Sequence, residues 1–160
     1  MTLAIRRYED ADRAAVVDLV HQLNLFEDGI SGDRAQDVKA AEACLDSDLA
    51  RIARDGGALL VAADGGEVVG MMCFALDQPQ PYLRAGIARV GWVTELVIDV
   101  RRRGQGIGTA LLEAAEALAR DLKVDRMMIG AIVGNHVARK AYERFGFRPA
   151  VLELAKDLSG

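Results

Sequence analysis

The feature that most constrains the fold is a glycine-rich junction at residues 92–112, where an apolar segment passes through three arginines into a helical pattern. The segment from Trp92 to Ile98 is rich in β-branched and aromatic residues and has the length of a strand. Apolar residues then recur at helical spacing from Ile107 to Ala119. The first N–H groups of a helix lack partners and carry partial positive charge, and glycines leave them accessible. The junction is therefore predicted to bind an anion such as a phosphate.

Two common phosphate-binding motifs do not fit this junction. A Walker loop needs Gly-Lys-Ser/Thr before its helix, whereas the chain reads Gly106-Ile107-Gly108-Thr109 without a lysine. A dinucleotide fingerprint has glycines at its first, third and sixth positions, but here the third glycine falls at the fifth. A purely structural turn remains an alternative, although three successive arginines before a helix repel one another unless they are solvated or paired with an anion.

The rest of the pattern predicts strands and helices around this junction. Before it we expect a strand over 3–8, a helix capped by Asp10 and ending near Asn24, an acidic loop over 25–32, a helix over 38–54, a hairpin of strands 58–63 and 67–76, and a loop over 78–86. After it we expect a strand over 126–133 parallel to the central one, a helix capped by Asn135 and closed by Gly146, and a last strand over 147–154.

Composition narrows the class of protein. The chain has 160 residues, of which 51% are hydrophobic, and this suits one soluble domain spanning residues 1–160. No apolar run approaches the roughly 18 residues of a membrane helix. Arg6, Arg7 and Glu9 stand where a secretory signal needs apolar residues, so we predict a cytoplasmic protein. The net charge of −4 disfavours a nucleic-acid partner and is compatible with a cationic substrate.

Metal binding and redox chemistry are not expected. Cys44 and Cys73 each lie in an apolar pattern without a Cys or His at ligand spacing, which favours buried structural thiols. His21 and His136 are also isolated in the sequence.

Two motifs resemble the signatures of the GNAT superfamily, the acetyl-CoA-dependent N-acetyltransferases. The segment from Arg103 to Gly108 matches the family motif Arg/Gln-x-x-Gly-x-Gly/Ala. A second signature, Asn-x-x-Ala-x-x-x-Tyr-x-x-x-Gly-Phe, is matched by Asn135, Ala138, Tyr142, Gly146 and Phe147. The predicted elements before Trp92 also follow the family order.

The resemblance implies a mixed α/β (α+β) fold. Its sheet is expected to be central, mixed and mostly antiparallel, with six to seven strands, helices on both faces and a splay between strands 4 and 5. Many relatives close the acceptor side with a hairpin after Gly-Phe, whereas here residues 148–160 leave room for one strand and a short tail. We therefore expect an open pocket or one completed by a second subunit, and we predict a homodimer.

The resemblance also implies where acetyl-CoA binds. The pyrophosphate is expected on the amides of the turn at 105–109, with Arg103 adding charge, and the pantetheine arm on the main chain of Leu96 to Ile98. Asn135 either contacts the pantetheine, orders the splay or serves only as a helix cap. The implied cofactor-binding residues are Leu96, Val97, Ile98, Arg103, Gly104, Gln105, Gly106, Ile107, Gly108, Thr109 and Asn135.

The expected chemistry is direct attack of an amine on the acetyl thioester in a ternary complex. An amine with a pKa of about 10.4 is neutral in only roughly one molecule in a thousand at pH 7, so a base must take its proton. Glu95, an acid within an apolar run, is the predicted base, and a surface or ion-paired position is its alternative. Tyr142 is the predicted acid toward the CoA thiolate, and aromatic packing beside Phe145 is its alternative.

The acceptor predicted from these features is a primary amine of a small molecule, such as an aminoglycoside or a polyamine-like compound. A protein N-terminus or lysine is the alternative acceptor, and a CoA-binding module without catalysis is the alternative class. The acidic residues of the loop over 25–32 and just after it either attract a cationic amine or stay solvated. These residues are Glu27, Asp28 and Asp33.

Overall fold

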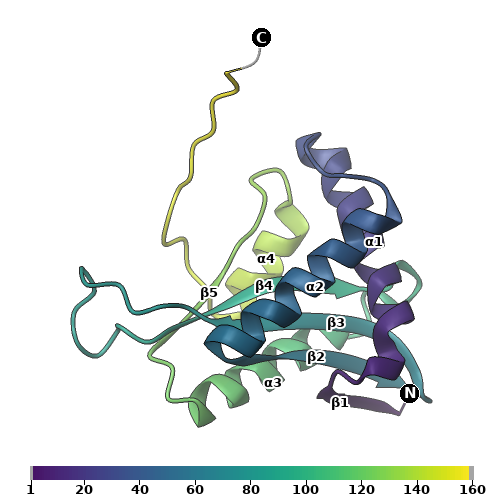
Figure 1. Ribbon diagram of the computed structural model, residues 1–160, viewed down its shortest axis with the longest axis horizontal. Coiled ribbons are helices and arrows are strands. Elements are labelled where there is room, and N and C mark those ends of the chain that lie inside the picture. Colours follow the sequence, from purple (N-terminus) through teal and green to yellow (C-terminus); the bar gives the residue numbers. More distant parts are fainter. Residues whose placement is uncertain (1, 159–160) are drawn as a thin grey trace.

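The structure is a computed structural model that describes residues 2–158, and over these residues five strands form one sheet with four helices around it (Figure 1). The strands are β1 (Leu3–Arg7), β2 (Gly57–Asp64), β3 (Glu67–Leu76), β4 (Val90–Ile98) and β5 (Arg126–Ile129). The helices are α1 (Arg13–Ser31), α2 (Val38–Asp55), α3 (Ile107–Asp121) and α4 (His136–Phe145). Two short 3-10 turns, η1 (Asp10–Asp12) and η2 (Val100–Arg102), precede α1 and the glycine turn.

The sheet is mixed, and its last pair of strands is short. Its order is β1-β2-β3-β4-β5, and all neighbours are antiparallel except β4 and β5, which are parallel. The parallel pairing joins Val90–Val93 to Arg126–Ile129 and then stops, while β4 continues to Ile98. Within the described residues, the second half of β4 therefore has a strand partner only on the β3 side. The predicted mixed sheet and its splay between the fourth and fifth strands are confirmed.

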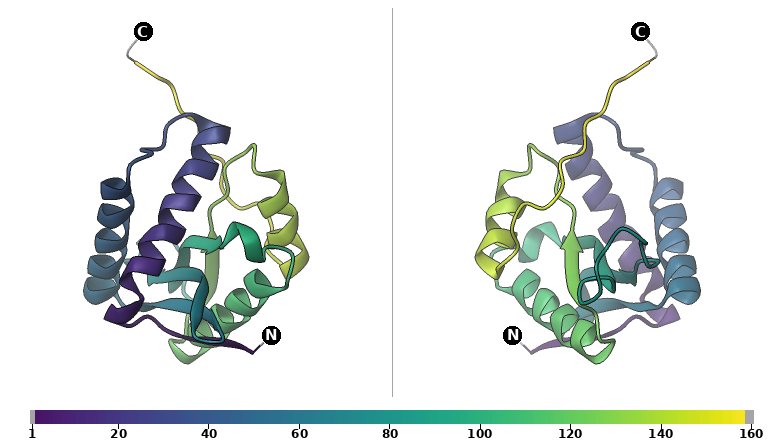
Figure 2. Two further views of the ribbon diagram at one scale, coloured as in Figure 1. Left: turned by 90° about the vertical axis from the view of Figure 1, so that its right-hand side faces the viewer. Right: turned by 90° about the vertical axis from the view of Figure 1, so that its left-hand side faces the viewer.

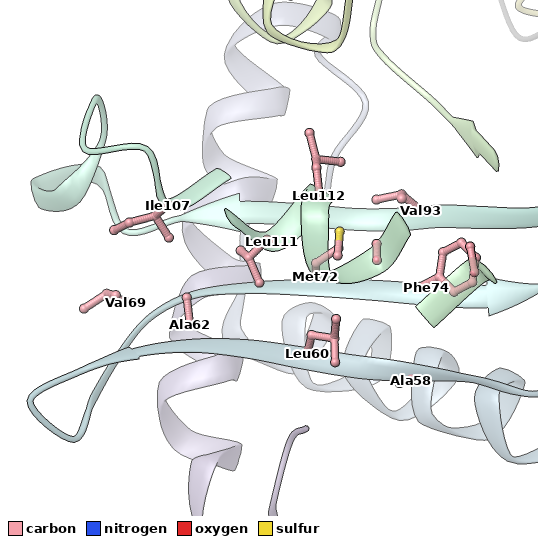
Figure 3. Packing of buried hydrophobic residues seen from close by; sticks show 12 residues of the cluster. Ala58, Leu60, Ala62, Val69, Met72, Phe74, Val93, Ile107, Leu111 and Leu112 are labelled. Carbon is pink, nitrogen blue, oxygen red and sulfur yellow. The ribbon is translucent and has the colours of Figure 1, made fainter. Parts of the chain in front are cut away.

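Helices pack on both faces of the sheet, as predicted. α1 and α2 lie on one face, and α3 and α4 lie on the other (Figure 2). On the α3 face, Leu111 and Leu112 pack against Leu60 and Met72 of the sheet, with Phe74 at one end of the same cluster (Figure 3). On the opposite face, residues such as Val20 of α1 and Leu45 of α2 cover the other side of β2 and β3.

Two expectations about strands are wrong. The sheet has five strands rather than six to seven, because residues 148–158 form no regular structure and point away from the body as the yellow tail in Figure 1. Phe147, expected to open a last strand, instead packs against the α3 face. The strand expected over 126–133 ends at Ile129, because β4 and β5 part there and a strand without a ladder partner is not stabilised.

The start and end of α1 also differ from the expectation. Asp10 lies in η1 and does not cap α1; instead the Asp12 carboxylate accepts the Glu9 N–H at 2.9 Å and pairs with Arg6. The helix does not end near Asn24 but continues to Ser31, so the predicted acidic loop is mostly helical. Gly32 ends it in a left-handed conformation, with φ of 70° and its N–H on the Asp28 carbonyl.

The other predicted elements are present. The hairpin of β2 and β3 turns at Gly65 and Gly66, and α2 covers the predicted range to within one residue. Over residues 2–158, no helix combines the length and the apolar character needed to cross a bilayer. The cytoplasmic location remains a prediction.

Candidate active site

The glycine turn places the start of α3 at the end of β4. Gly104 and Gly106 adopt left-handed conformations with φ of 76° and 80°, and Gly106 is the N-cap of α3. An added Cβ at either position meets no atom within 4 Å, so backbone conformation rather than crowding requires glycine here. No side chain among the described residues caps α3, and its first N–H groups remain available to an anion.

Protein carboxylates neutralise two of the three arginines before this turn. Arg101 pairs with Asp99 at 2.7 Å and with Glu67 at 3.3 Å, and its guanidinium lowers the pKa of Asp99 to about 2. Arg102 pairs with Asp64. The repulsion expected within the arginine run is thus relieved inside the protein. Arg101 and Arg102 are structural residues in this arrangement.

Arg103 is arranged differently from its two neighbours. No carboxylate among residues 2–158 forms an ion pair with it. Its guanidinium lies 5.0 Å from the centre of the Phe26 ring on α1, and its Nε donates to the Ile98 carbonyl at 3.4 Å. Arg103 therefore keeps a positive charge next to the glycine turn, which suits the phosphate-binding role predicted for it.

A bulge in β4 decides which side chains face α1 and α2. Cys73 of β3 is opposite Glu95 and Phe74 is opposite Val93, so Thr94 is an extra residue in β4. Thr94 bonds to Asp48 of α2, and the Glu95 charge acts on Cys44 of the same helix. Both side chains therefore lie on the α1 and α2 face, although neighbouring residues of a regular strand point to opposite faces.

Glu95 is half-buried among other carboxylates. Burial, then the charges of Asp48 and Glu27, raise its pKa to about 8, and the nearby Arg34 opposes this rise. A group with such a pKa can take up a proton from a substrate near neutral pH. No ion pair involves Glu95 within the described part of the chain, which disfavours the ion-paired alternative.

Tyr142 approaches the same place from α4, on the other side of the sheet. Its ring packs against the α3 face and meets Phe147 edge-on at 6.2 Å between centroids. Burial, followed by the charges of Glu27 and Glu95, raises its pKa to about 12, so the hydroxyl keeps its proton at neutral pH. Glu95 lies on the opposite face, just past the end of the parallel pairing, and its charge contributes to this rise. The two predicted catalytic residues are therefore close enough to interact electrostatically, and their catalytic roles stay predictions.

The predicted cofactor residues of β4 differ in what they offer a ligand. Leu96 and Ile98 pack toward the α3 cluster and Val97 toward α1 and α2, so their side chains are used in the two cores. Their main chain on the β5 side lies beyond the end of the parallel pairing. The main chain of these residues is thus available on the β5 side, and its contact with the pantetheine arm stays a prediction.

Asn135 caps α4, as its simplest interpretation predicts. Its Oδ1 accepts the Ala138 N–H at 3.1 Å, and Gly146 closes the helix with a left-handed φ of 115°. The cap uses Oδ1, so the Nδ2 group is the part of the side chain left for a ligand.

The predicted acidic residues near α1 have separate roles. Glu27 pairs with Arg34 at 3.0 Å and contributes charge to both Glu95 and Tyr142. Asp28 and Asp33 close the turn after α1, where Asp28 accepts the Arg34 N–H and Asp33 accepts the Ser31 hydroxyl. Only Glu27 belongs to the site.

Asp48 and Thr94 were not identified from the sequence. A usable signal was present, because Asp48 falls on the apolar stripe of α2 with Ala41, Leu45 and Ile52 at helical spacing. A carboxylate on a buried stripe requires a polar partner. The bulge that supplies this partner leaves no comparable signal. No group of three or more potential metal ligands occurs within residues 2–158.

Comparisons with known proteins identify the family of this fold and site. The family model described as the acetyltransferase (GNAT) family matches residues 24–147, and the chain therefore belongs to the GNAT family. Members of that family use acetyl-CoA as the acetyl donor. An acetyltransferase structure from Trypanosoma brucei matches at a TM-score of 0.70 and 22% identity, over 98% of this chain and 99% of that one. The structure of a predicted acetyltransferase with acetyl-CoA from Clostridium acetobutylicum matches at a TM-score of 0.73 and 18% identity, over 98% of this chain and 97% of that one.

Curated relatives are similar over part of the chain. A mycothiol acetyltransferase from Salinispora tropica is 35% identical over 95 residues, which are 58% of this chain and 29% of that protein. An L-amino acid N-acetyltransferase from Escherichia coli is 34% identical over 95 residues, which are 59% of this chain and 55% of the relative. The chain thus matches about half or less of the length of these relatives.

Substitution of Gly106 tests the glycine turn. We expect Gly106→Val to abolish acetyl-CoA binding in calorimetry, because a β-branched residue is strained by roughly 1–3 kcal/mol at this left-handed φ and displaces the α3 amides. Gly86→Val is the matched control, since Gly86 also has a positive φ of 91° and open space around it but lies in another loop. Normal acetyl-CoA binding by Gly106→Val would contradict the placement of the pyrophosphate.

Proposed function

We propose that residues 1–160 form one acetyltransferase domain that transfers the acetyl group of acetyl-CoA to a primary amine by direct attack. The observation that supports this most is that β4 and β5 part just before Glu95, whose charge also raises the pKa of Tyr142 from the opposite face. The glycine turn at the end of β4 supplies free helix amides and Arg103 for the pyrophosphate. The proposed cofactor-binding residues are those predicted from the sequence.

The groups of the site can take and give the protons that this reaction moves. The acceptor enters mainly as an ammonium ion, and the Glu95 carboxylate takes its proton so that the free amine attacks the thioester carbon. The C–N bond forms as the C–S bond breaks, and the CoA thiolate leaves. Tyr142, protonated at neutral pH, donates a hydrogen bond and then a proton to that sulfur. As the amide forms, its nitrogen loses a second proton, which returns through solvent to the Tyr142 phenolate, and Glu95 gives its proton to solvent after the product leaves.

The charges around Glu95 favour a cationic small-molecule acceptor, such as a polyamine or an aminoglycoside. Glu27, Asp48 and Glu95 converge there, and the nearby Arg34 is already paired with Glu27. Such a site attracts ammonium groups and repels the carboxylate of an α-amino acid. A protein amine is the second candidate acceptor, because a relative from Bacillus subtilis is described as a putative ribosomal-protein alanine N-acetyltransferase.

An amine panel tests the proposed activity. We expect CoA release with putrescine, spermidine and an aminoglycoside to exceed release with neutral L-amino acids or an N-terminal alanine peptide at least tenfold in kcat/KM. Gly106→Val serves as the inactive control. Faster turnover of the amino acids or the peptide would contradict the acceptor class. Acetyl-CoA binding without turnover of any amine would support a CoA-binding module instead.

Two single substitutions separate the base from the acid. The Glu95 carboxylate is the active form, so kcat of the wild type should rise with pH, with a midpoint near its pKa of about 8 and a plateau above it. Glu95→Gln should lower kcat about 100-fold and remove this rise. Tyr142→Phe should lower kcat about 10- to 100-fold while sparing acetyl-CoA affinity. An unchanged kcat in either variant would remove that residue from its role.

We also propose a homodimer in which the tail of one chain packs on another. Residues 148–158 are exposed and include Val151, Leu152, Leu154 and Leu158, which are apolar side chains in water. β5 is the last strand of the sheet order, so its outer edge can accept a further strand. Light scattering at micromolar concentration should give twice the mass of one chain, and removal of residues 150–160 should halve it. A monomeric mass for the full chain would contradict the dimer.

A further inference from the structure

Asp48 is a buried carboxylate with an incomplete set of partners. It lies on α2 facing the sheet and is only 9% exposed. Its Oδ1 accepts the Thr94 hydroxyl at 3.2 Å, while its buried Oδ2 has no hydrogen-bond partner among the described residues. Such burial destabilises the fold, so a functional reason for keeping the carboxylate is worth seeking. Burial also raises the pKa of Asp48.

The bond between Asp48 and Thr94 joins α2 to the bulge of β4. Thr94 is the extra residue of that bulge, and Glu95 follows it directly. Strict alternation from Val93, which faces α3, would turn Glu95 toward α3 as well. The bulge shifts the alternation of side chains by one residue. Val97 therefore joins the core under α1 and α2, while Leu96 and Ile98 face α3. The orientation of Glu95 therefore depends on the bulge.

We propose that Asp48 is a positioning residue: it binds the Thr94 hydroxyl, holds the β4 bulge in place and so keeps Glu95 on the face where the acceptor amine enters. This inference rests on the proposed role of Glu95 as the base. Asp48 itself does not contact the reacting atoms. Its buried position between α2 and β4 explains why a carboxylate interrupts the apolar stripe of α2.

The charge of Asp48 has a second effect on Glu95. The groups whose charges or dipoles act on this region are Glu27 and Arg34 near α1, Cys44 and Arg51 of α2, Cys73 of β3 and Tyr142 of α4. Among these neighbours, the charge of Asp48 raises the pKa of Glu95 more than that of Glu27, whereas Arg34 lowers it. A negative charge beside a carboxylate makes it hold its proton more strongly. Asp48 thus also increases the basicity of Glu95.

Two substitutions separate these effects. Asp48→Asn keeps an oxygen that accepts the Thr94 hydroxyl but removes the charge, so kcat at its plateau should stay within about threefold while the pH midpoint falls by about 1 pH unit. Thr94→Val removes the hydroxyl, so kcat should fall about 10- to 100-fold with unchanged acetyl-CoA affinity. Thr94→Ser restores the hydroxyl and should restore kcat. Asp46→Asn, an exposed position on the same helix, is the matched control.

The titration of Glu95 can also be measured without turnover, by NMR of the labelled glutamate carboxyls with Glu95→Gln for assignment. Both Asp48→Asn and Thr94→Val should lower the Glu95 midpoint, and Asp46→Asn should not. An unchanged midpoint in Thr94→Val would overturn the proposal, as would wild-type kcat in that variant. An unchanged midpoint in Asp48→Asn would contradict the effect of the Asp48 charge on Glu95. If the wild type turns over no amine, the proposed function fails, and the NMR midpoint of Thr94→Val alone decides whether the bond between Asp48 and Thr94 positions Glu95.

Discussion

The short parallel pairing of β4 and β5 is the constraint on which the site depends. It ends at Val93 and Ile129, and from there β4 continues without β5 beside it. This parting leaves main-chain groups of β4 without a partner on the β5 side among residues 2–158, next to Glu95, whose charge raises the pKa of Tyr142 from the other face. The glycine turn follows directly at the end of the same strand. One irregularity in the sheet therefore provides the proposed cofactor surface next to Glu95, the proposed base.

Charge is distributed differently at the two ends of this opening. At the glycine turn, Asp99 and Asp64 neutralise Arg101 and Arg102, which leaves Arg103 as the cation beside the α3 amides. On the α1 and α2 side, Glu95 and Asp48 lie close together and partly buried, which disfavours their charged forms. The first arrangement suits a phosphate, and the second gives Glu95 the raised pKa that the proposed base requires.

Local patterns in the sequence predicted much of this fold. The hairpin turn, the caps at Asn135 and Gly146, and the strand, turn and helix around Gly106 were all correct, because each depends on residues close together in the chain. The wrong predictions concern segments whose structure depends on tertiary contacts. The tail after Phe147 has strand-like residues but pairs with no strand, and α1 continues through an acidic segment that composition alone suggested was a loop.

The sequence by itself indicated the family and the glycine turn, and it singled out Glu95 and Tyr142 as candidate catalytic residues, because these follow from motifs and from an acid within an apolar run. Only the tertiary structure decided that Asp48 binds Thr94 next to Glu95, that Phe26 lies under Arg103, and that two of the three arginines are internally paired. The physical reason is that a bulge moves the side chain of every later residue in its strand to the opposite face of the sheet. Its position depends on contacts between elements distant in sequence rather than on local pattern.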